Sequence, residues 1–392
     1  MNDKICVLPW THLQVFPTGV INPCCQSQLD LGNIKDTTLD EVINGEIMSK
    51  VRLDMLAGRE AEICIKCYRK ENSGAQSMRN IYNDMWGNDR VEEEIKNTNS
   101  DGTLKEKFKY KNIPLRISNL CNYGCRMCWS GSSSLIGQER GIINFVKKST
   151  ERRPTFMDEL LEHMNHVEYL VIMGGEPILI KEHDILLERI IELGRQDQVE
   201  IIYFSNLSKL QYHGRSIVEY SKIFSKFTVR ASIEAMGEKL ELFRYGSQWT
   251  NVERNIKELI TNGVNVEFFP AISALNVYDF PDFFKYTVES GWVTDNIDVN
   301  IVDVPPEINP RVLPAGLREQ ITQRYVDLQE WLSTVENVDN RKLIAKCQEV
   351  IDYINSRDDS HLISRFVEFN KKMDNMRSQN FQEVFPELKS LT

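Results

Sequence analysis

Apolar and polar residues follow two different rhythms along the middle of the chain. Short runs rich in β-branched and aromatic residues alternate with longer stretches in which apolar residues recur every three or four positions, which predicts strands alternating with helices. We expect helices over 154–166, 184–193 and 252–260, the last closed by Asn262-Gly263. We expect strands over 113–117, 167–173, 199–204, 227–233, 264–272 and 297–302.

This alternation indicates an α/β fold. Six strands that are each paired with a helix imply right-handed crossovers and a mainly parallel sheet. Periodicity alone leaves two architectures open, a doubly wound sheet and a partial barrel.

Two regions with weaker or different patterns flank this core. The first 85 residues contain few strong elements, with one helical stretch around 39–56. Residues 88–110 are polar and charged, as in a linker or an exposed helix plus loop. Beyond Pro310 the pattern is helical, and one predicted helix face carries Phe366, Phe369, Met373 and Met376. The domains predicted from this are 1–87, a linker at 88–112, a core at 113–306, and a helical extension at 307–392.

Composition and charge favour an ordinary globular protein. Of 392 residues, 41% are hydrophobic and 27% charged, which is neither disordered nor low-complexity. With 47 basic against 57 acidic residues the net charge is −10, so nucleic acid and anionic membranes are not expected partners. No apolar run approaches the ~20 residues that span a bilayer, and residues 1–6 lack a secretory profile. We therefore expect a cytoplasmic protein.

The nine cysteines change this picture. Eight of them lie within the first 128 residues, which points to metal chemistry because cytosolic proteins rarely keep structural disulfides. Three, Cys121, Cys125 and Cys128, directly follow the first core strand. Three thiolates leave one iron of a four-iron cluster without a protein ligand, and that iron is free to bind a substrate or cofactor. A zinc knuckle with a distant fourth ligand is the alternative.

This cysteine triplet resembles the signature of the radical S-adenosylmethionine (SAM) enzymes. The match comprises the run Cys-Asn-Tyr-Gly-Cys-Arg-Met-Cys at 121–128 and a second motif after the next strand, Gly174, Gly175, Glu176 and Pro177. The resemblance implies a partial (β/α)6 TIM-like barrel and a 4Fe-4S cluster on the triplet, with SAM chelating the open iron. It also implies that the second motif binds the methionine amine, for which Glu176 is a suitable acceptor.

Further family positions have counterparts at the carboxyl ends of later strands, where sites form in such folds. By resemblance they line the SAM ribose, carboxylate and adenine. Met127 departs from the family, which usually has an aromatic residue there, and Trp129 is a candidate replacement. The predicted SAM contacts are Ser205, Asn206, Ser232, Glu234 and Ile272.

The N-terminal cysteines resemble the SPASM and Twitch auxiliary-cluster domains. Cys6, twelve residues, Gly19, four residues and Cys24 form the opening motif, and a Cys-x2-Cys unit follows much later. Four thiolates, those of Cys6, Cys24, Cys64 and Cys67, suffice to ligate a second 4Fe-4S cluster, although Cys25 competes with Cys24. A four-cysteine zinc ribbon is the alternative. In most such enzymes this module follows the barrel, whereas here it precedes it. The resemblance covers roughly residues 5–305.

The resemblance implies an enzyme that cleaves SAM reductively to a 5′-deoxyadenosyl radical, which abstracts hydrogen from a substrate C–H bond. The first hypothesis is a two-electron oxidation or crosslink assisted by the auxiliary cluster, on a small-molecule or peptide substrate. The alternatives are a redox-neutral epimerase or isomerase and a non-catalytic metal-binding protein. A flavodoxin or ferredoxin electron donor is implied. For Cys347 we expect a structural role, with hydrogen donation to a substrate radical as the alternative.

Overall fold

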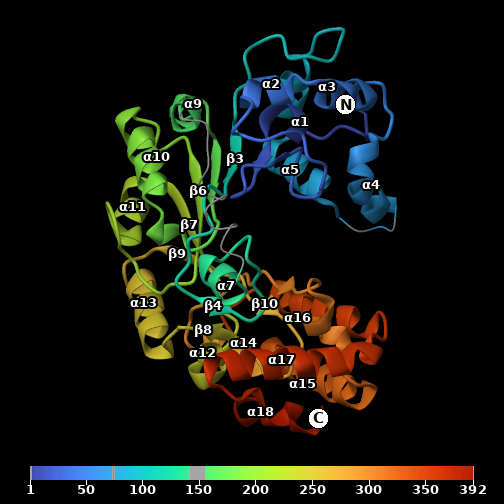
Figure 1. The fold of residues 1–392 in the computed structure, drawn as a ribbon, viewed down its shortest axis with the longest axis vertical. Helices are drawn as coiled ribbons and strands as arrows, with labels where there is room; N and C mark the ends of the chain where they lie inside the picture. Colours follow the sequence, from blue (N-terminus) through green and yellow to red (C-terminus); the bar gives the residue numbers. More distant parts are fainter. Residues whose placement is uncertain (1, 73, 75, 142–154, 392) are drawn as a thin grey trace. The chain divides into compact units, whose positions relative to one another are not determined.

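A computed structural model describes residues 2–72, 74, 76–141 and 155–391 of the chain. The chain divides into two compact units. Figure 1 labels the helices and strands that are described below. The first unit comprises residues 1–120, 130–202 and 223–226, and the second comprises 121–129, 203–222 and 227–392.

The N-terminal part of the first unit is more helical than the sequence predicted. The single helix expected over 39–56 is broken at Asn44 and Gly45, because Asn44 caps one helix and Gly45, with extended backbone, begins the next. Three further helices, at 8–11, 65–72 and 78–86, were missed because they are short or because cysteines and polar residues obscure their periodicity. The elements are α1 (Leu8–Thr11), β1 (Gln14–Val15), β2 (Ile21–Asn22), α2 (Leu39–Ile43), α3 (Glu46–Leu56), α4 (Ile65–Asn72), α5 (Met78–Trp86) and α6 (Asn88–Ile95).

This N-terminal part is joined to the first core strand by buried backbone contacts. Lys111 N donates to Thr11 O at 3.0 Å, and His12 Nδ1 lies 3.0 Å from Asn112 O on β3 (Asn112–Leu115). The hydroxyl of Tyr110 donates to Leu13 O. The N-terminal part and the sheet edge thus form one packed body.

The predicted parallel sheet is present. Five strands are arranged in the order β3-β5-β6-β7-β9, with parallel pairing and register Asn112↔Tyr169 at one edge and Thr228↔Asn265 at the other. The additional strands are β5 (Tyr169–Ile172), β6 (Glu200–Ser205), β7 (Lys226–Ala231) and β9 (Asn265–Phe268). The helices of this region are α7 (Ser134–Glu139), α9 (Phe156–His163), α10 (Lys181–Glu192), α11 (Ile217–Ile223), α12 (Gly237–Phe243), α13 (Trp249–Thr261) and α14 (Phe280–Glu289). The predicted helix over 154–166 corresponds to α9, with Pro154 outside the described residues.

The expected sixth strand pairs with the fifth across an interruption. Pro270, which has no backbone N–H to donate, separates β9 from β10 (Ala271–Ile272). The partner segment nevertheless continues along both, since Asp298 N donates to Phe268 O at 2.9 Å and Asn300 N donates to Pro270 O at 2.9 Å. The parallel pair of β10 and β11 (Asn300–Ile301) completes the partial barrel edge that the sequence predicted.

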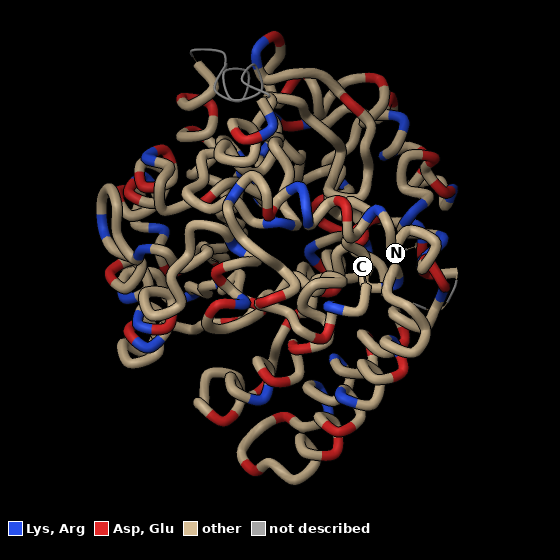
Figure 2. Tube along the Cα trace, turned by 60° about the horizontal axis from the view of Figure 1, so that its bottom comes forward, with Lys and Arg blue, Asp and Glu red and all other residues tan. Residues whose placement is uncertain are grey.

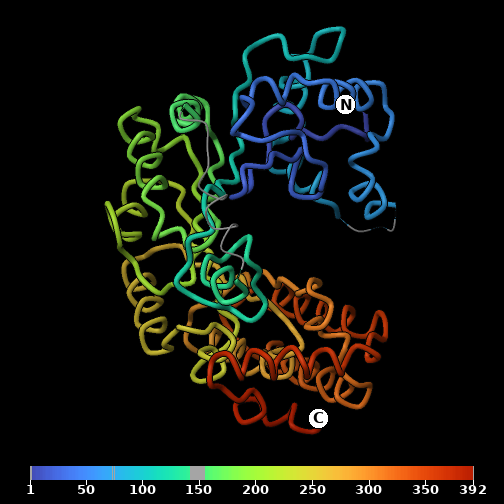
Figure 3. Tube along the Cα trace, in the orientation of Figure 1, coloured from blue at the N-terminus to red at the C-terminus, as the bar shows by residue number. Residues whose placement is uncertain are grey.

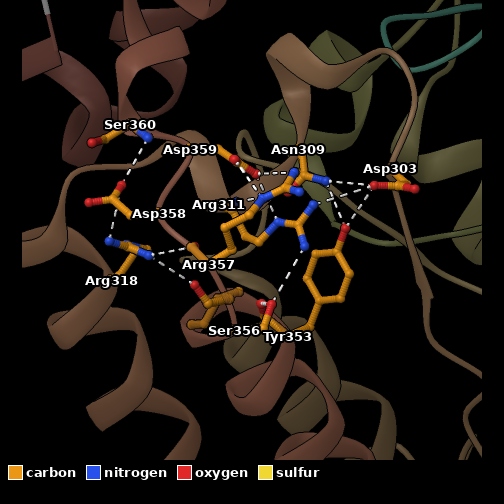
Figure 4. A network of polar contacts seen from close by, with 11 residues as sticks. Asp303, Asn309, Arg311, Arg318, Tyr353, Ser356, Arg357, Asp358, Asp359 and Ser360 are labelled. Atoms are coloured by element: carbon orange, nitrogen blue, oxygen red, sulfur yellow. Dashed lines mark hydrogen bonds and ion pairs between the residues drawn. The ribbon is translucent and has the colours of Figure 1, made fainter. Parts of the chain in front are cut away.

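The region beyond 307 is helical, as predicted (Figure 3, orange to red). A polar network ties it to the end of the sixth strand (Figure 4). Asn309 Nδ2 donates to the hydroxyl of Tyr353 at 2.7 Å and to Asp303 Oδ1 at 3.2 Å, while Arg311 Nε lies 3.0 Å from Asp359 Oδ2. The helices are α15 (Ala315–Thr334), α16 (Asn340–Asn355), α17 (Ile363–Arg377) and α18 (Phe381–Val384).

One face prediction in this region was wrong. On α17, Phe366 and Met373 are buried but Met376 is 44% exposed. Polar residues take its place, because Asn370, Asp374 and Arg377 are buried on the core-facing side.

The surface carries both charge signs. Acidic and basic residues are interspersed along the trace (Figure 2). Among the described residues, none of the helices combines the length and the apolar character needed to cross a bilayer.

Candidate active site

The cysteine loop at 121–128 is held by a short antiparallel ladder in the second unit. Strand β4 (Gly124–Cys125) pairs with β8 (Arg244–Tyr245), with Cys125 opposite Arg244. Cys128 N donates to Cys125 O at 3.0 Å, which closes a turn between two of the three thiols. Cys125 is buried, whereas Cys121 and Cys128 are half-buried. The loop thus presents its thiols from a fixed backbone.

A buried ion pair supports the central thiol. Arg244 Nε and Nη2 each lie 2.6 Å from a carboxylate oxygen of Glu234, and Arg244 Nη1 lies 3.6 Å from Cys125 Sγ. Burial raises the pKa of Cys125, while the Arg244 guanidinium acts in the opposite direction. Burial also raises the pKa of Glu234 despite Arg244 beside it. The structure therefore gives Glu234 a role that the sequence did not suggest, to hold a cation against the cysteine loop.

The glycine-rich motif lies in the first unit against the segment that precedes the cysteine loop. Gly175 N donates to Ser118 O at 3.2 Å, and Glu176 N donates to Leu120 O at 2.7 Å. A Cβ on Gly175 would lie 2.0 Å from Leu120 O, so only glycine permits this approach. Glu176 is buried, and Pro177 begins a short 3-10 turn.

The other predicted SAM contacts lie at strand ends of the second unit. Ser232 N donates to Ser205 O at 2.9 Å, and Asn206 Nδ2 donates to Asn122 Oδ1 at 3.1 Å. Asn206 therefore touches the cysteine loop, because Asn122 directly follows Cys121. Ile272 on β10 is fully buried. Their contacts with SAM stay predictions.

The N-terminal cysteines surround one pocket in the first unit. All five, Cys6, Cys24, Cys25, Cys64 and Cys67, line this pocket. Cys24 follows a tight turn in which Gly19 has φ +84° and donates its N–H to Phe16 O at 2.8 Å. Arg79 also lines the pocket, and it is fixed because Nη1 donates to Ile5 O at 2.7 Å. The predicted ligands are thus brought together from three separate segments.

Without a cluster, the thiols of this pocket favour the protonated form. Burial, reinforced by neighbouring cysteines, raises the pKa of Cys24 to about 11 and that of Cys64 to about 12. A bound cluster reverses this preference, because iron binds thiolates. Four or five thiols that converge on one pocket match the donor set of an iron–sulfur cluster.

The loop at 121–128 fits a SAM-binding cluster for a related reason. It offers three thiols and a guanidinium donor directed at one of them, and hydrogen bonds to ligand sulfurs are a common means of tuning such clusters. Among the described residues, no group of three or more His, Cys, Asp or Glu side chains has the spacing to hold a single metal ion.

Comparison with known families supports both candidate cluster sites, the cysteine loop of the core and the N-terminal cysteine pocket. The model of the radical SAM superfamily matches residues 115–287, and that of SPASM, an iron–sulfur cluster-binding domain, matches residues 6–68. No curated protein matches the chain. The chain is therefore a radical SAM protein whose SPASM domain precedes the core. Its cofactors are SAM with the iron–sulfur cluster of the core, and the auxiliary cluster of the SPASM domain.

Solved structures show more distant similarity. One described as "Native anSMEcpe with bound AdoMet and Cp18Cys peptide" is 16% identical with a TM-score of 0.39, and the match covers 55% of this chain and 58% of that one. Another, "Structure of TYW1 with a lysine-pyruvate adduct bound", is 12% identical with a TM-score of 0.29, covering 55% and 71%. The chain thus spans little more than half of the first of these proteins.

Sequence reasoning missed two arginines of this site. Arg244 follows the fourth core strand and stands between Phe243 and Tyr245, and Arg126 lies inside the cysteine motif itself. The signal available for Arg126 was its place between two ligands. Nothing local indicated its side-chain partners, which lie 244 to 253 positions away.

Proposed function

We propose that the protein uses a reduced 4Fe-4S cluster on Cys121, Cys125 and Cys128 to cleave SAM and carries out a two-electron oxidation or crosslink of its substrate. Cleavage of bound SAM supplies a 5′-deoxyadenosyl radical that abstracts hydrogen from a C–H bond. The oxidation leaves one further electron to be removed. Cys6, Cys24, Cys64 and Cys67 would hold a second 4Fe-4S cluster, which would supply an acceptor for that electron.

The convergence of the N-terminal thiols on one pocket carries this proposal. A cluster with four protein thiolates has no open iron, so it suits electron transfer rather than substrate binding. Five thiols line the pocket, one more than such a cluster needs. Cys24 is the fourth ligand in the proposal, since Cys25 is exposed.

The chain's own residues have defined tasks in SAM binding. Glu176 accepts hydrogen bonds from the methionine ammonium, and Gly174 and Gly175 allow the backbone to approach it. Ser205, Asn206, Ser232 and Ile272 line the nucleoside. Glu234, whose two carboxylate oxygens both accept from Arg244, acts through that arginine.

The redox-neutral alternative is less well supported. Epimerisation needs a hydrogen donor, and Cys347 on α16 is only 1% exposed. So deeply buried a thiol is poorly placed to reach a substrate radical, which favours oxidation over epimerisation.

The proposal includes partners and boundaries. The cluster at Cys121 needs a flavodoxin or ferredoxin as electron donor, and the substrate is a small molecule or peptide. We propose an auxiliary domain at 1–87, a linker at 88–112, a core at 113–306 and a helical extension at 307–392.

Deuterium transfer tests the reaction. Anaerobically reconstituted protein is incubated with SAM, reductant and deuterated candidate substrates, both peptides and small molecules, and 5′-deoxyadenosine is analysed by mass spectrometry. We expect deuterium in 5′-deoxyadenosine and a product two hydrogens lighter, with neither in a Cys125→Ala control. A product of unchanged mass with inverted configuration would favour the epimerase, and absence of SAM cleavage would refute the proposal.

A further inference from the structure

A buried arginine within the cysteine loop reaches a helix far along the chain. Arg126 stands next to Cys125 and two positions before Cys128, and its side chain has no exposed surface. Its Nη2 lies 2.5 Å from Asp374 Oδ1, and its Nη1 lies 3.0 Å from Asn370 Oδ1. Both partners belong to α17, which lies in the second unit together with the loop.

All five N–H donors of this guanidinium have an acceptor. Besides the two side chains of α17, Nη1 lies 3.3 Å from Asn370 O, Nη2 lies 3.2 Å from Gln379 Oε1, and Nε lies 3.4 Å from Leu242 O. A guanidinium has five donors in a fixed planar geometry, so five acceptors define its position and orientation. Burial lowers the pKa of Arg126 and Asp374 counteracts this, as expected of a cation that depends on its partner.

The acceptors are themselves held in place. Asp374 Oδ2 accepts a hydrogen bond from Phe381 N at 2.9 Å, at the start of α18. Asn370 Nδ2 donates to Phe366 O at 2.9 Å within α17. The helix then ends at Ser378, whose left-handed backbone (φ +52°) turns the chain, and Gln379 N donates to Asp374 O at 3.1 Å.

A second contact joins the same helix to the ladder behind the loop. The guanidinium of Arg377 lies over the ring of Tyr245, 4.7 Å from its centroid. Tyr245 pairs with Gly124, the residue before Cys125. Helix α17 therefore contacts both the loop and the strand that pairs with it.

The contacts of Arg126 affect the positions of two thiols, those of Cys125 and Cys128. The backbone of Arg126 is fixed to Phe243 O by a 2.9 Å hydrogen bond, and its side chain is fixed to α17. Because one residue separates it from Cys128 and none from Cys125, a displacement of Arg126 moves both sulfurs. Without the Arg126 guanidinium as a partner, burying Asn370 and Asp374 on α17 would be unfavourable, since unpaired buried polar and charged groups are costly.

We propose that Asp374 and Asn370, acting through Arg126, are positioning residues for the SAM-binding cluster. The C-terminal helical region is then part of the SAM-binding apparatus. This inference rests on the proposed function, because it assumes a cluster on Cys121, Cys125 and Cys128.

The test separates positioning from stability with three variants and a control. Asp374→Asn removes the charge but keeps an acceptor oxygen, and Arg126→Met removes the buried cation. The double variant Arg126→Met/Asp374→Leu replaces the whole pair with apolar side chains, which commonly restores stability. The matched control is Asp282→Asn, which breaks a 2.7 Å ion pair with Arg324 elsewhere in the second unit.

Each protein is reconstituted anaerobically, and its iron content, melting temperature, SAM dissociation constant and EPR spectrum after reduction, with and without SAM, are measured. We expect all three variants to bind SAM about tenfold more weakly and to lose part of the EPR change on SAM addition, because small displacements of ligand-holding groups are costly. The double variant should regain part of the melting temperature that Arg126→Met loses, since the Phe381 N–H stays without its acceptor, and it should not regain SAM binding. Asp282→Asn should behave as wild type.

A stable double variant with wild-type SAM affinity and EPR response would overturn the inference and leave the ion pair a stability element. If Arg126→Met does not fold, Asp374→Asn provides the test. Wild-type SAM affinity and EPR response in Asp374→Asn would likewise overturn the inference. If wild-type protein itself shows no SAM-dependent EPR change, the proposed function fails, and the inference with it.

Discussion

Replacing Gly175 by alanine should disrupt SAM binding through a backbone collision. The added Cβ would lie 2.0 Å from Leu120 O and 2.6 Å from Asn119 C, whereas such contacts are essentially never shorter than 3.0 Å. The turn and the segment before Cys121 must therefore separate by about 1 Å. This strains the hydrogen bond from Glu176 N to Leu120 O, which is 2.7 Å long. Overpacking of this kind costs about 1–3 kcal/mol.

The functional effect should exceed the loss of stability. Because a 1 Å misplacement can cost about a hundredfold in rate, we expect SAM affinity to fall at least tenfold and reductive cleavage by about a hundredfold. The assays are equilibrium binding of SAM to the reconstituted protein and formation of 5′-deoxyadenosine. The control is Gly316→Ala in α15, where no atom lies within 4 Å of the added Cβ. Wild-type SAM affinity in Gly175→Ala would refute the reasoning.

Three further predictions concern the clusters and the acid stability of the first unit. Reconstituted protein should contain about eight irons per chain by ligand arithmetic, measured together with acid-labile sulfide. Cys64→Ala should lose the auxiliary cluster alone, so SAM cleavage should continue while oxidised product disappears. Burial lowers the pKa of His163 to about 4, so the unfolded chain binds the extra proton between pH 6.5 and 4. The contribution of the neutral His163 to the free energy of unfolding is fully present above pH 6.5 and falls by up to about 3 kcal/mol as the pH approaches 4. The variant His163→Asn should lose less stability over this pH range in melting experiments.

Each of these predictions has a result that contradicts it. Four irons with one stoichiometric zinc would assign the N-terminal pocket to zinc. A Cys64→Ala protein that retains both clusters would mean that Cys25 serves as a ligand. If the melting temperature falls equally with decreasing pH in wild type and in His163→Asn, another group is responsible for the acid sensitivity.

The strands were predictable because their signals are local. Short apolar runs such as Tyr169–Ile172 form strands, and they alternate with helices whose apolar residues recur every three or four positions. The helix break at Asn44 and Gly45 was missed because apolar residues on both sides continue one apparent pattern.

The motifs of the site were predictable, but their supports were not. Cysteine spacing indicated both sets of candidate ligands without any knowledge of the fold. The partners of Arg126 and Arg244 depend on which distant segments the fold brings together, and no periodicity encodes that. Met376 was placed on a buried face because hydrophobicity alone guided the prediction, whereas a buried cation selects polar partners such as Asp374.

The 248 positions between Arg126 and Asp374 also have a consequence for synthesis of the protein. At about 5–20 residues per second, the ribosome needs roughly 12–50 s after making Arg126 before it reaches its ion-pair partner. During that interval Cys121, Cys125 and Cys128 are already part of the nascent chain, but the helix that orients their loop does not yet exist. Insertion of the SAM-binding cluster therefore belongs after translation of α17, and a nascent chain stalled before that helix would present oxidisable thiols in an unfinished loop.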